Sequence, residues 1–351
     1  MKQAASNQRW TQRPEGSNWG DFGADDQRGR LNFLTPEKVL QGISEVRAGL
    51  AFCLSLPLDY PGGNLLNQRR HPPQMHAVLR NGRPYYNYRW NVEQPGLTDV
   101  SSDEAVLLYS QYSTQWDSLA HVGSQFDADG DGVAEAVYYN GYRGGEHVMG
   151  PPQETVDGKL VVEPVCARAL GIENMATTGV QGRGVLIDLH SRCGRERRAV
   201  SYDMLMRIMD DDDVEIEKGD MLCVHTGFAQ MLLDMKKDPD PALLHSSCAV
   251  LDGHDSRLLR WIDDVGIAVL ISDNHAVEAR PQQFPQNYKG PALPLHEHCL
   301  FKLGIHLGEL WYLTELAGWL RTNKRSRFLL TAPPLRLPGA VGSPVTPVAT
   351  V

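Results

Sequence analysis

The apolar run Gly184-Val-Leu-Ile-Asp-Leu189 most constrains the fold of this chain. Consecutive apolar residues such as Val185, Leu186 and Ile187 are typical of a strand that is buried on both faces, because both sets of alternate side chains then avoid water. Further strands are expected around 52–57, 105–109, 114–117, 135–139, 220–226, 267–272 and 328–331, and helices near 36–48, 201–210, 229–236, 254–265, 296–303 and 313–321. Strands mixed with helices in this way predict an α/β chain.

The chain is expected to form one domain. Its 351 residues can bury a large core, and no Ser/Gly-rich or charged linker divides them. We therefore predict a single domain over 1–351 with an N-terminal arm of about residues 1–35. The six cysteines stand singly, which is typical of reduced thiols.

Charge and hydropathy exclude several classes of partner. A formal charge of −9 argues against nucleic acid and anionic membrane surfaces, because both require clustered Lys and Arg. The chain has no apolar run long enough to span a bilayer, and its first residues are too polar for a signal peptide. We expect a cytoplasmic protein that binds a small molecule.

The segment from Gln111 to His121 carries the candidate chemistry. If its backbone is extended, Gln111, Gln115, Asp117 and His121 share one face, because alternate side chains of a strand point the same way. A carboxylate and an imidazole suit a divalent metal, whereas a glutamine oxygen is a weak neutral ligand. The alternative is that these polar groups only satisfy a buried strand.

Gln111-Tyr-Ser-Thr-Gln-Trp-Asp-Ser-Leu-Ala-His121 resembles the signature His-x-Gly-Thr-His-x-Asp-x-Pro-x-His of the cyclase family of metal-dependent hydrolases. This family contains bacterial kynurenine formamidases and isatin hydrolases. Asp117 and His121 match the signature, but Gln111 and Gln115 replace its first two histidines. The resemblance implies a β-barrel-like core of mixed sheets flanked by helices.

A second match to the family lies downstream. His296 follows a Pro-containing loop, and Glu309 follows Leu303-Gly-Ile-His-Leu-Gly. By resemblance, Asp117, His296 and Glu309 would hold a divalent metal, zinc or manganese, with Gln111 and Gln115 as further oxygen ligands. Glu309 is then expected within about 6 Å of Asp117, His121 or His296, because a buried carboxylate needs a partner.

The resemblance implies a hydrolase acting on an amide or ester-like C–N or C–O bond of a small, cyclic or aromatic substrate. Arylformamidase, cyclic imide or isatin hydrolase, and lactonase activities fit this class. Asp117, His121 and Glu309 would be catalytic, with His121 as the general base and acid. The aromatic side chains Trp116, Phe228 and Trp90 could line a pocket for a planar substrate.

Two other functions stay open from the sequence. One is a metal-free acid–base enzyme, a lyase or hydratase, on the same scaffold. The other is a small-molecule-binding protein without catalysis. By analogy with the family we also expect a homodimer or homotetramer, with the N-terminal arm packing on a partner subunit.

The segment Asp127-Ala-Asp-Gly-Asp-Gly-Val-Ala-Glu135 begins like a calcium-binding EF-hand loop, but Tyr138 stands where that loop requires a bidentate Glu. We predict a polar hairpin tip between two strands, with weak calcium binding as the alternative.

Overall fold

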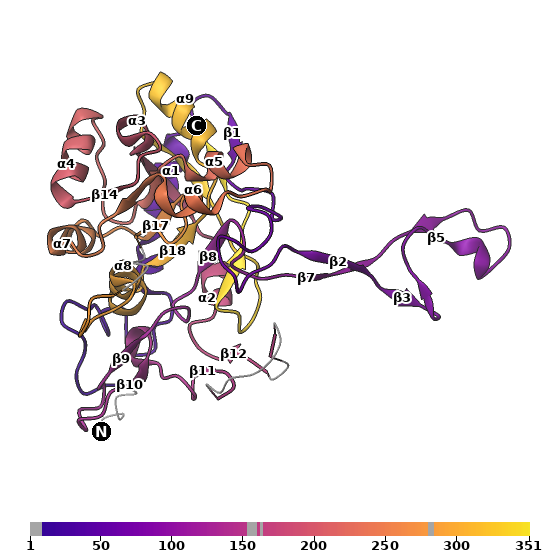
Figure 1. Ribbon diagram of the computed structural model, residues 1–351, viewed down its shortest axis with the longest axis horizontal. Coiled ribbons are helices and arrows are strands. Elements are labelled where there is room, and N and C mark those ends of the chain that lie inside the picture. The colour runs from indigo at the N-terminus through magenta and orange to yellow at the C-terminus, as the bar shows by residue number, and fades with distance from the viewer. Residues whose placement is uncertain (1–8, 153–159, 162–163, 280–283) are drawn as a thin grey trace.

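One nine-stranded sheet forms the centre of the molecule (Figure 1). The structure is a computed structural model and describes residues 9–152, 160–161, 164–279 and 284–351. In spatial order the strands are β1 (Ala51–Cys53), β21 (Val348–Thr350), β19 (Arg327–Thr331), β13 (Gln181–Asp188), β15 (Met221–His225), β17 (Val269–Ser272), β18 (His306–Glu309), β8 (Gln115–Asp117) and β20 (Gly342–Pro344).

The middle of this sheet is parallel and its flanks are antiparallel. β13, β15, β17 and β18 run the same way, whereas β8 pairs antiparallel with both β18 and β20. The sheet curls without closing, since β1 lies at one edge and β20 at the other. The predicted α/β class and the barrel-like mixed sheet are confirmed.

Helices cover both faces of the sheet, as the apolar run in β13 requires. Val185 and Ile187 pack into one apolar cluster, and Leu186 between them packs into another. The helices are α1 (Pro36–Ser44), α2 (Ile172–Ala176), α3 (His190–Cys193), α4 (Tyr202–Asp211), α5 (Phe228–Asp234), α6 (Pro241–Ser246), α7 (Ser256–Val265), α8 (Pro294–His296) and α9 (Thr314–Thr322), with 3-10 turns η1 (Gly29–Phe33), η2 (Trp90–Val92) and η3 (Tyr139–Gly141) and the π-helical segment η4 (Glu297–Leu303). Side chains of α4 and α7 complete the first cluster, and side chains of α9 complete the second.

Local sequence signals set the ends of α7. The Asp255 carboxylate accepts hydrogen bonds from the backbone N–H groups of Arg257 and Leu258, which lack partners inside the helix. Gly266 ends the helix in the left-handed conformation, which costs glycine little. This boundary is predictable from the sequence because both signals are local.

Residues 9–35 pack against the chain's own core. The Trp19 indole is buried and donates to the carbonyl oxygen of Phe301 at 2.8 Å, and Asn18 donates to that of Leu303 at 2.9 Å. The described part of the expected arm is therefore built into the body of its own chain, and its contact with a partner subunit stays a prediction. Residues 1–8 of the expected arm lie outside the described residues.

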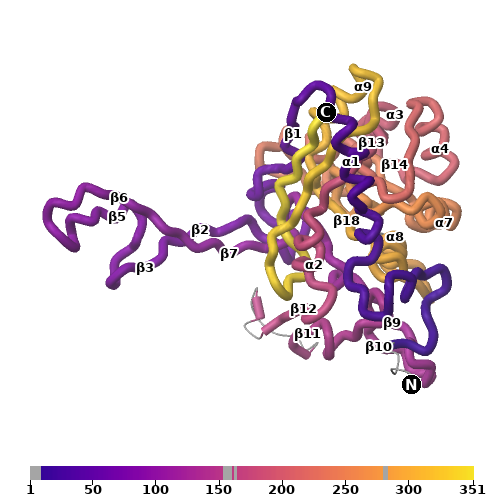
Figure 2. The backbone as a smooth tube through the Cα atoms, turned by 180° about the vertical axis from the view of Figure 1, so that it is seen from behind, coloured from indigo at the N-terminus to yellow at the C-terminus, as the bar shows by residue number. Residues whose placement is uncertain are grey.

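A different segment projects from the body. Residues 68–109 form a long arm that extends away from the sheet and its helices, as two opposite views show (Figures 1 and 2). Its stem is a ribbon of β2 (Gln74–Ala77) and β7 (Glu104–Leu107). Its far end contains β3 (Leu79–Arg80) with β4 (Arg83–Pro84), and β5 (Tyr88–Arg89) with β6 (Val100–Ser101). The strand predicted at 105–109 therefore belongs to the arm.

Three small ribbons complete the fold: β9 (Ser124–Phe126) with β10 (Glu135–Val137), β11 (Val148–Met149) with β12 (Cys166–Ala167), and β14 (Arg198–Val200) with β16 (Ala249–Leu251). The first is the hairpin predicted around Asp127 to Glu135. Its tip is closed by backbone N–H groups that donate to the Asp127 carboxylate. Within the described part of the chain, no helix is long and apolar enough to cross a membrane.

Candidate active site

Polar side chains gather at one edge of the sheet, where the parallel strands end. Asp188 ends β13, His225 ends β15, Asp273 follows β17 and Glu309 ends β18. Neighbouring parallel strands present their carboxyl ends at the same edge, which is where open α/β sheets place their binding sites. The row divides into two groups with different surroundings.

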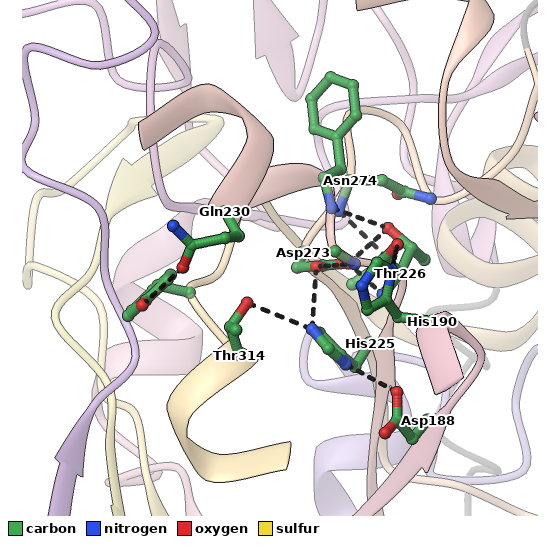
Figure 3. A network of polar contacts seen from close by, with 12 residues as sticks. Asp188, His190, His225, Thr226, Gln230, Asp273, Asn274 and Thr314 are labelled. Carbon is green, nitrogen blue, oxygen red and sulfur yellow. Dashed lines mark hydrogen bonds and ion pairs between the residues drawn. The ribbon is translucent and has the colours of Figure 1, made fainter. Parts of the chain in front are cut away.

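The first group is a closed hydrogen-bond network (Figure 3). The imidazole of His225 contacts Asp188 through Nδ1 at 2.8 Å and the Thr314 hydroxyl through Nε2 at 3.2 Å. Asp273 accepts hydrogen bonds from the backbone N–H and hydroxyl of Thr226, both at 2.7 Å. Each of these polar groups has a hydrogen-bond partner within the network, which connects α9 and the turn after β15 to the sheet.

A hollow of about 540 Å³ lies beside this network and is lined by residues of β13, α4 and α9. Several of its charged side chains are already paired, since Arg321 contacts Asp188 and Arg192 contacts Asp212. None of the catalytic or metal-binding residues predicted from the sequence lines this hollow.

The second group contains the predicted metal ligands. Asp117, His296 and Glu309 are all buried, and each offers one ligand atom within 4.8 Å of the others. The expected proximity of Glu309 to this group is confirmed, since its Oε1 lies 3.2 Å from Nε2 of His296. β8 carries Asp117, β18 carries Glu309, and α8 brings His296 over their ends.

Sheet register aligns Gln115 with Glu309. The two residues lie directly opposite each other on β8 and β18, and Nε2 of Gln115 donates to Oε2 of Glu309 at 3.0 Å. The Gln115 side-chain oxygen and Oδ2 of Asp117 are buried without a hydrogen-bond partner in the structure. Two orphaned buried oxygens therefore point to a missing positive group, because leaving such atoms unpaired is costly.

Gln111 also lies at this site, but it does not lie on the extended strand that was expected to carry it. Only 115–117 is a strand, and Gln111 lies in the turn before it. Its Nε2 lies 2.6 Å from Oδ1 of Asp117 and 2.9 Å from Nδ1 of His121. A Cβ on Gly342 would lie 2.8 Å from Cγ of Gln111, so glycine at this position leaves room for the amide beside Asp117.

His296 is held between two carboxylates. Its Nδ1 contacts Glu278 at 2.9 Å and its Nε2 contacts Glu309. Burial by itself lowers the pKa of His296, but these two hydrogen bonds raise the pKa to about 10. Burial by itself would raise the pKa of Glu309, yet the His296 hydrogen bond and charge hold that pKa below its usual range. The two carboxylates thus favour the imidazolium form of His296 when no cation is bound.

The pKa of His121 is shifted in the opposite direction, below its usual value. Its side chain retains 23% exposure and lies 3.9 Å from Oδ1 of Asp117. Burial lowers the pKa of His121, against the opposing charge of Asp117. Burial also raises the pKa of Asp117, against the charge of His121. A neutral imidazole at the accessible side of the group can accept a proton.

Sequence reasoning missed three residues of this site. Glu278 holds His296 and accepts the backbone N–H groups of Leu295 and His296. Arg70 donates to the carbonyl oxygen of Gln111 at 2.6 Å and, with His275, lines a small pocket next to the ligands. His275 and Glu278 lie in the segment Ile271-Ser-Asp-Asn-His-Ala-Val-Glu278, which resembles a strand of the family. That resemblance did not indicate a role for either His275 or Glu278.

The three aromatic residues expected at a substrate pocket lie in different places. Trp116 points to the face opposite Asp117, where it packs edge-on against Trp311 in the core. Trp90 lies in the projecting arm. Phe228 is buried in a small cluster with Leu66 and Leu310. Trp116 therefore lies on the side of the sheet away from the candidate site, because alternate residues of β8 face opposite sides.

Fold and site together define an α/β protein with a buried carboxylate–imidazole cluster at the edge of a mixed sheet. The Cyclase family model matches residues 54–279, which is more than half of the chain, and the chain belongs to this family. The match spans Asp117 and His121 but ends before His296 and Glu309. None of the curated proteins matches the chain.

Solved structures share the fold. A crystal structure described as a novel cyclase is 28% identical, with a TM-score of 0.71 over 95% of this chain and 97% of that one. Isatin hydrolase A from Labrenzia aggregata, bound to benzyl benzoate, is 13% identical, with a TM-score of 0.53 over 90% and 98% of the two chains. Isatin hydrolase A from Ralstonia solanacearum is 14% identical, with a TM-score of 0.53 over 90% and 97%. The likeness to the two isatin hydrolases is one of fold.

Proposed function

We propose that this protein is a hydrolase that opens an amide or ester-like C–N or C–O bond of a small, cyclic or aromatic substrate. The observation that carries the proposal is the buried group of Asp117, His296 and Glu309 beside the accessible His121. The names of the isatin hydrolases with the same fold support this class of reaction.

The residues of the site fit a divalent metal, zinc or manganese. Two carboxylates and an imidazole are ligand types that such ions accept, and the orphaned oxygen of Gln115 offers one further donor atom. His296 would have to lose its Nε2 proton to Glu309 or to solvent before it could bind a cation. When bound, the ion would polarise a carbonyl group and lower the pKa of water.

The side chains of the chain supply the remaining steps. His121 is proposed to accept a proton at Nδ1, which requires the Gln111 amide that faces this atom to move away first. Gln111 holds both the acid and the base, so it fixes the distance between Asp117 and His121. Arg70 has no carboxylate partner among the described residues, and we propose that its guanidinium attracts the carboxylate that hydrolysis creates.

A second candidate is a metal-free acid–base enzyme, a lyase or hydratase. It is favoured by the orientation of the two amides, because Gln111 and Gln115 present N–H groups to Asp117 and Glu309. With the His296 imidazolium, these donors already supply positive charge to the carboxylates. In this case Asp117, His121 and Glu309 would move protons without a cation.

Metal analysis combined with turnover tests the two candidates. The purified protein is assayed with formanilide, isatin, phthalimide and γ-butyrolactone before chelation, after chelation, and after addition of zinc or manganese. The first candidate predicts turnover that disappears with the metal and returns with it. Turnover that is indifferent to chelation would remove the metal from the mechanism and leave metal-free acid–base catalysis, and the absence of turnover in every condition would contradict the hydrolase.

A further inference from the structure

A small pocket lies next to the candidate metal ligands. Pro61 and Leu66 form its apolar wall, and its polar lining consists of Asn64, Asn67, Arg70, Tyr112 and His275. Its volume is about 10 Å³, which is close to the space that one water molecule needs. The pocket can therefore receive one small polar group at the end of a ligand, and the rest of the ligand would lie outside it.

Three of the polar side chains in this pocket are already hydrogen bonded to the backbone of the chain. The Tyr112 hydroxyl donates to the carbonyl oxygen of Gly63 at 2.9 Å and accepts from the N–H of Gly62 at 3.0 Å. The amide of Asn64 donates to a backbone carbonyl oxygen, and that of Asn67 accepts from a backbone N–H. These three side chains shape the pocket more than they await a ligand.

His275 and Arg70 retain free hydrogen-bonding atoms. No described residue donates to or accepts from the ring nitrogens of His275. Arg70 uses Nη1 to donate to the carbonyl oxygen of Gln111, which leaves its other N–H groups available. A guanidinium only donates hydrogen bonds, and a neutral imidazole donates through one of its nitrogens. The group that satisfies both side chains at once is therefore an oxygen acceptor.

The turn after β17 places His275 at this pocket. The carbonyl oxygen of Asn274 accepts the N–H of Leu310 at 3.1 Å, so His275 follows a residue that is fixed beside Glu309. Two positions later, Val277 has a φ of 55°, a left-handed conformation that β-branched residues rarely adopt. Such strain persists only where the surrounding contacts fix the backbone, and it is common at ligand sites.

Electrostatics make His275 compatible with the cation beside it. Burial lowers the pKa of His275 to about 4, against the opposing charge of Glu309. The imidazole is therefore neutral near pH 7, and it can lie beside the Arg70 guanidinium without like-charge repulsion. The pocket thus combines one positive donor with one neutral donor.

We propose that His275 is a substrate-binding residue, and that its imidazole and the Arg70 guanidinium hold the same carboxylate. Opening of a cyclic amide or ester leaves a carboxylate, and its two oxygens can accept one hydrogen bond from each side chain. The inference rests on the proposed function, because it takes the product of that hydrolysis as the ligand. Contact at two points selects a carboxylate over an uncharged group of the same shape.

Benzoate is the probe for this pocket, because it carries a carboxylate on an aromatic ring and is not consumed by hydrolysis. Its binding to the full-length protein is measured by isothermal titration calorimetry, with nitrobenzene as an uncharged probe of similar shape. His275→Phe is expected to weaken benzoate binding about 10-fold, the effect of one hydrogen bond to a charged group, and to leave nitrobenzene binding unchanged. His275→Gln keeps an N–H donor and should recover most of the benzoate affinity.

His245→Phe is the matched control, because His245 is an exposed histidine of α6 that does not line the pocket. It is expected to bind benzoate as the native protein does, and circular dichroism checks that all variants are folded. Unchanged benzoate affinity in His275→Phe would overturn the inference, and turnover of a test substrate in the same protein would leave the hydrolase standing. A native protein that binds no benzoate would overturn the inference as well. Loss of benzoate binding in His275→Phe alone, in a protein without turnover, would support the carboxylate pocket and contradict only the hydrolase.

Discussion

The two glutamines at positions 111 and 115 define the chemistry of the site at the scale of single residues. Each amide donates to a carboxylate, and each occupies a position where the family signature has histidine. A glutamine amide offers two N–H donors and a neutral oxygen, whereas an imidazole can bind a metal with its ring nitrogen. Compared with the signature histidines, the two glutamines are weaker metal ligands, but they donate hydrogen bonds to Asp117 and Glu309.

A first residue-scale prediction concerns His121. His121→Ala is expected to lower kcat by about 100-fold or more, because the proposed proton acceptor is lost. The circular dichroism spectrum and metal content should stay unchanged, since Asp117, His296 and Glu309 remain in place. Near-normal turnover would remove His121 from the reaction.

A second residue-scale prediction concerns metal affinity. The double variant Gln111→His/Gln115→His is expected to retain more zinc or manganese through dialysis than the native protein, because two imidazoles replace two amides. Metal per chain is measured by mass spectrometry, with Gln111→Asn/Gln115→Asn as the control that keeps the amide chemistry. Equal retention in all three proteins would place these positions away from a cation.

At the scale of elements, His225 connects β15 to β13 and α9 through Asp188 and Thr314. Burial by itself lowers the pKa of His225, but the Asp188 hydrogen bond and the nearby Asp273 charge raise it above its usual value. The folded state therefore binds this proton more tightly than the unfolded chain. The resulting stability is fully present below about pH 6.5 and is lost as pH rises through the raised pKa.

His225→Gln is therefore expected to reduce the free energy of unfolding by about 3 kcal/mol near pH 6, because a buried charged pair loses one partner. The loss should be smaller toward pH 9, because native His225 releases its proton as the pH rises through the raised pKa. Denaturant titrations of both proteins at the two pH values measure this difference. A loss that grows with pH would contradict the raised pKa.

The β9–β10 hairpin permits a further element-scale prediction. Asp127, Asp129 and Asp131 lie close together, but Asp129 pairs with Arg143 and the Asp127 carboxylate accepts backbone N–H groups. We expect calorimetric titration to detect no calcium binding tighter than about millimolar, because the bidentate ligand of such loops is missing. A micromolar site that disappears in Asp129→Ala would show the opposite.

At the scale of the whole molecule, a metal at Asp117, His296 and Glu309 would join β8, β18 and α8, which are distant in sequence. A ligand that binds only the folded state stabilises it by mass action. Zinc or manganese at a hundred times its dissociation constant is expected to raise the free energy of unfolding by about 2.7 kcal/mol. Asp117→Asn, measured in parallel by denaturant titration, should lose most of this gain. An equal gain in both proteins would show that the ion binds elsewhere.

Local signals in the sequence determined much of the fold. The apolar run of β13, the cap of α7 and the polar hairpin after β9 depend on residues that are close in sequence, so their patterns are readable without the structure. The family resemblance predicted that Glu309 lies close to Asp117, which no local pattern in the sequence indicates.

Only the tertiary structure decided the remaining contacts. Sheet register sets Gln115 opposite Glu309 and turns Trp116 toward the core, while Glu278 reaches His296 from a separate loop. The arm at 68–109 likewise emerges from the packing, because the same alternating strands could have joined the central sheet. Such contacts depend on which distant segments become neighbours, and that choice is made by the burial and hydrogen bonding of the whole chain rather than by any local pattern.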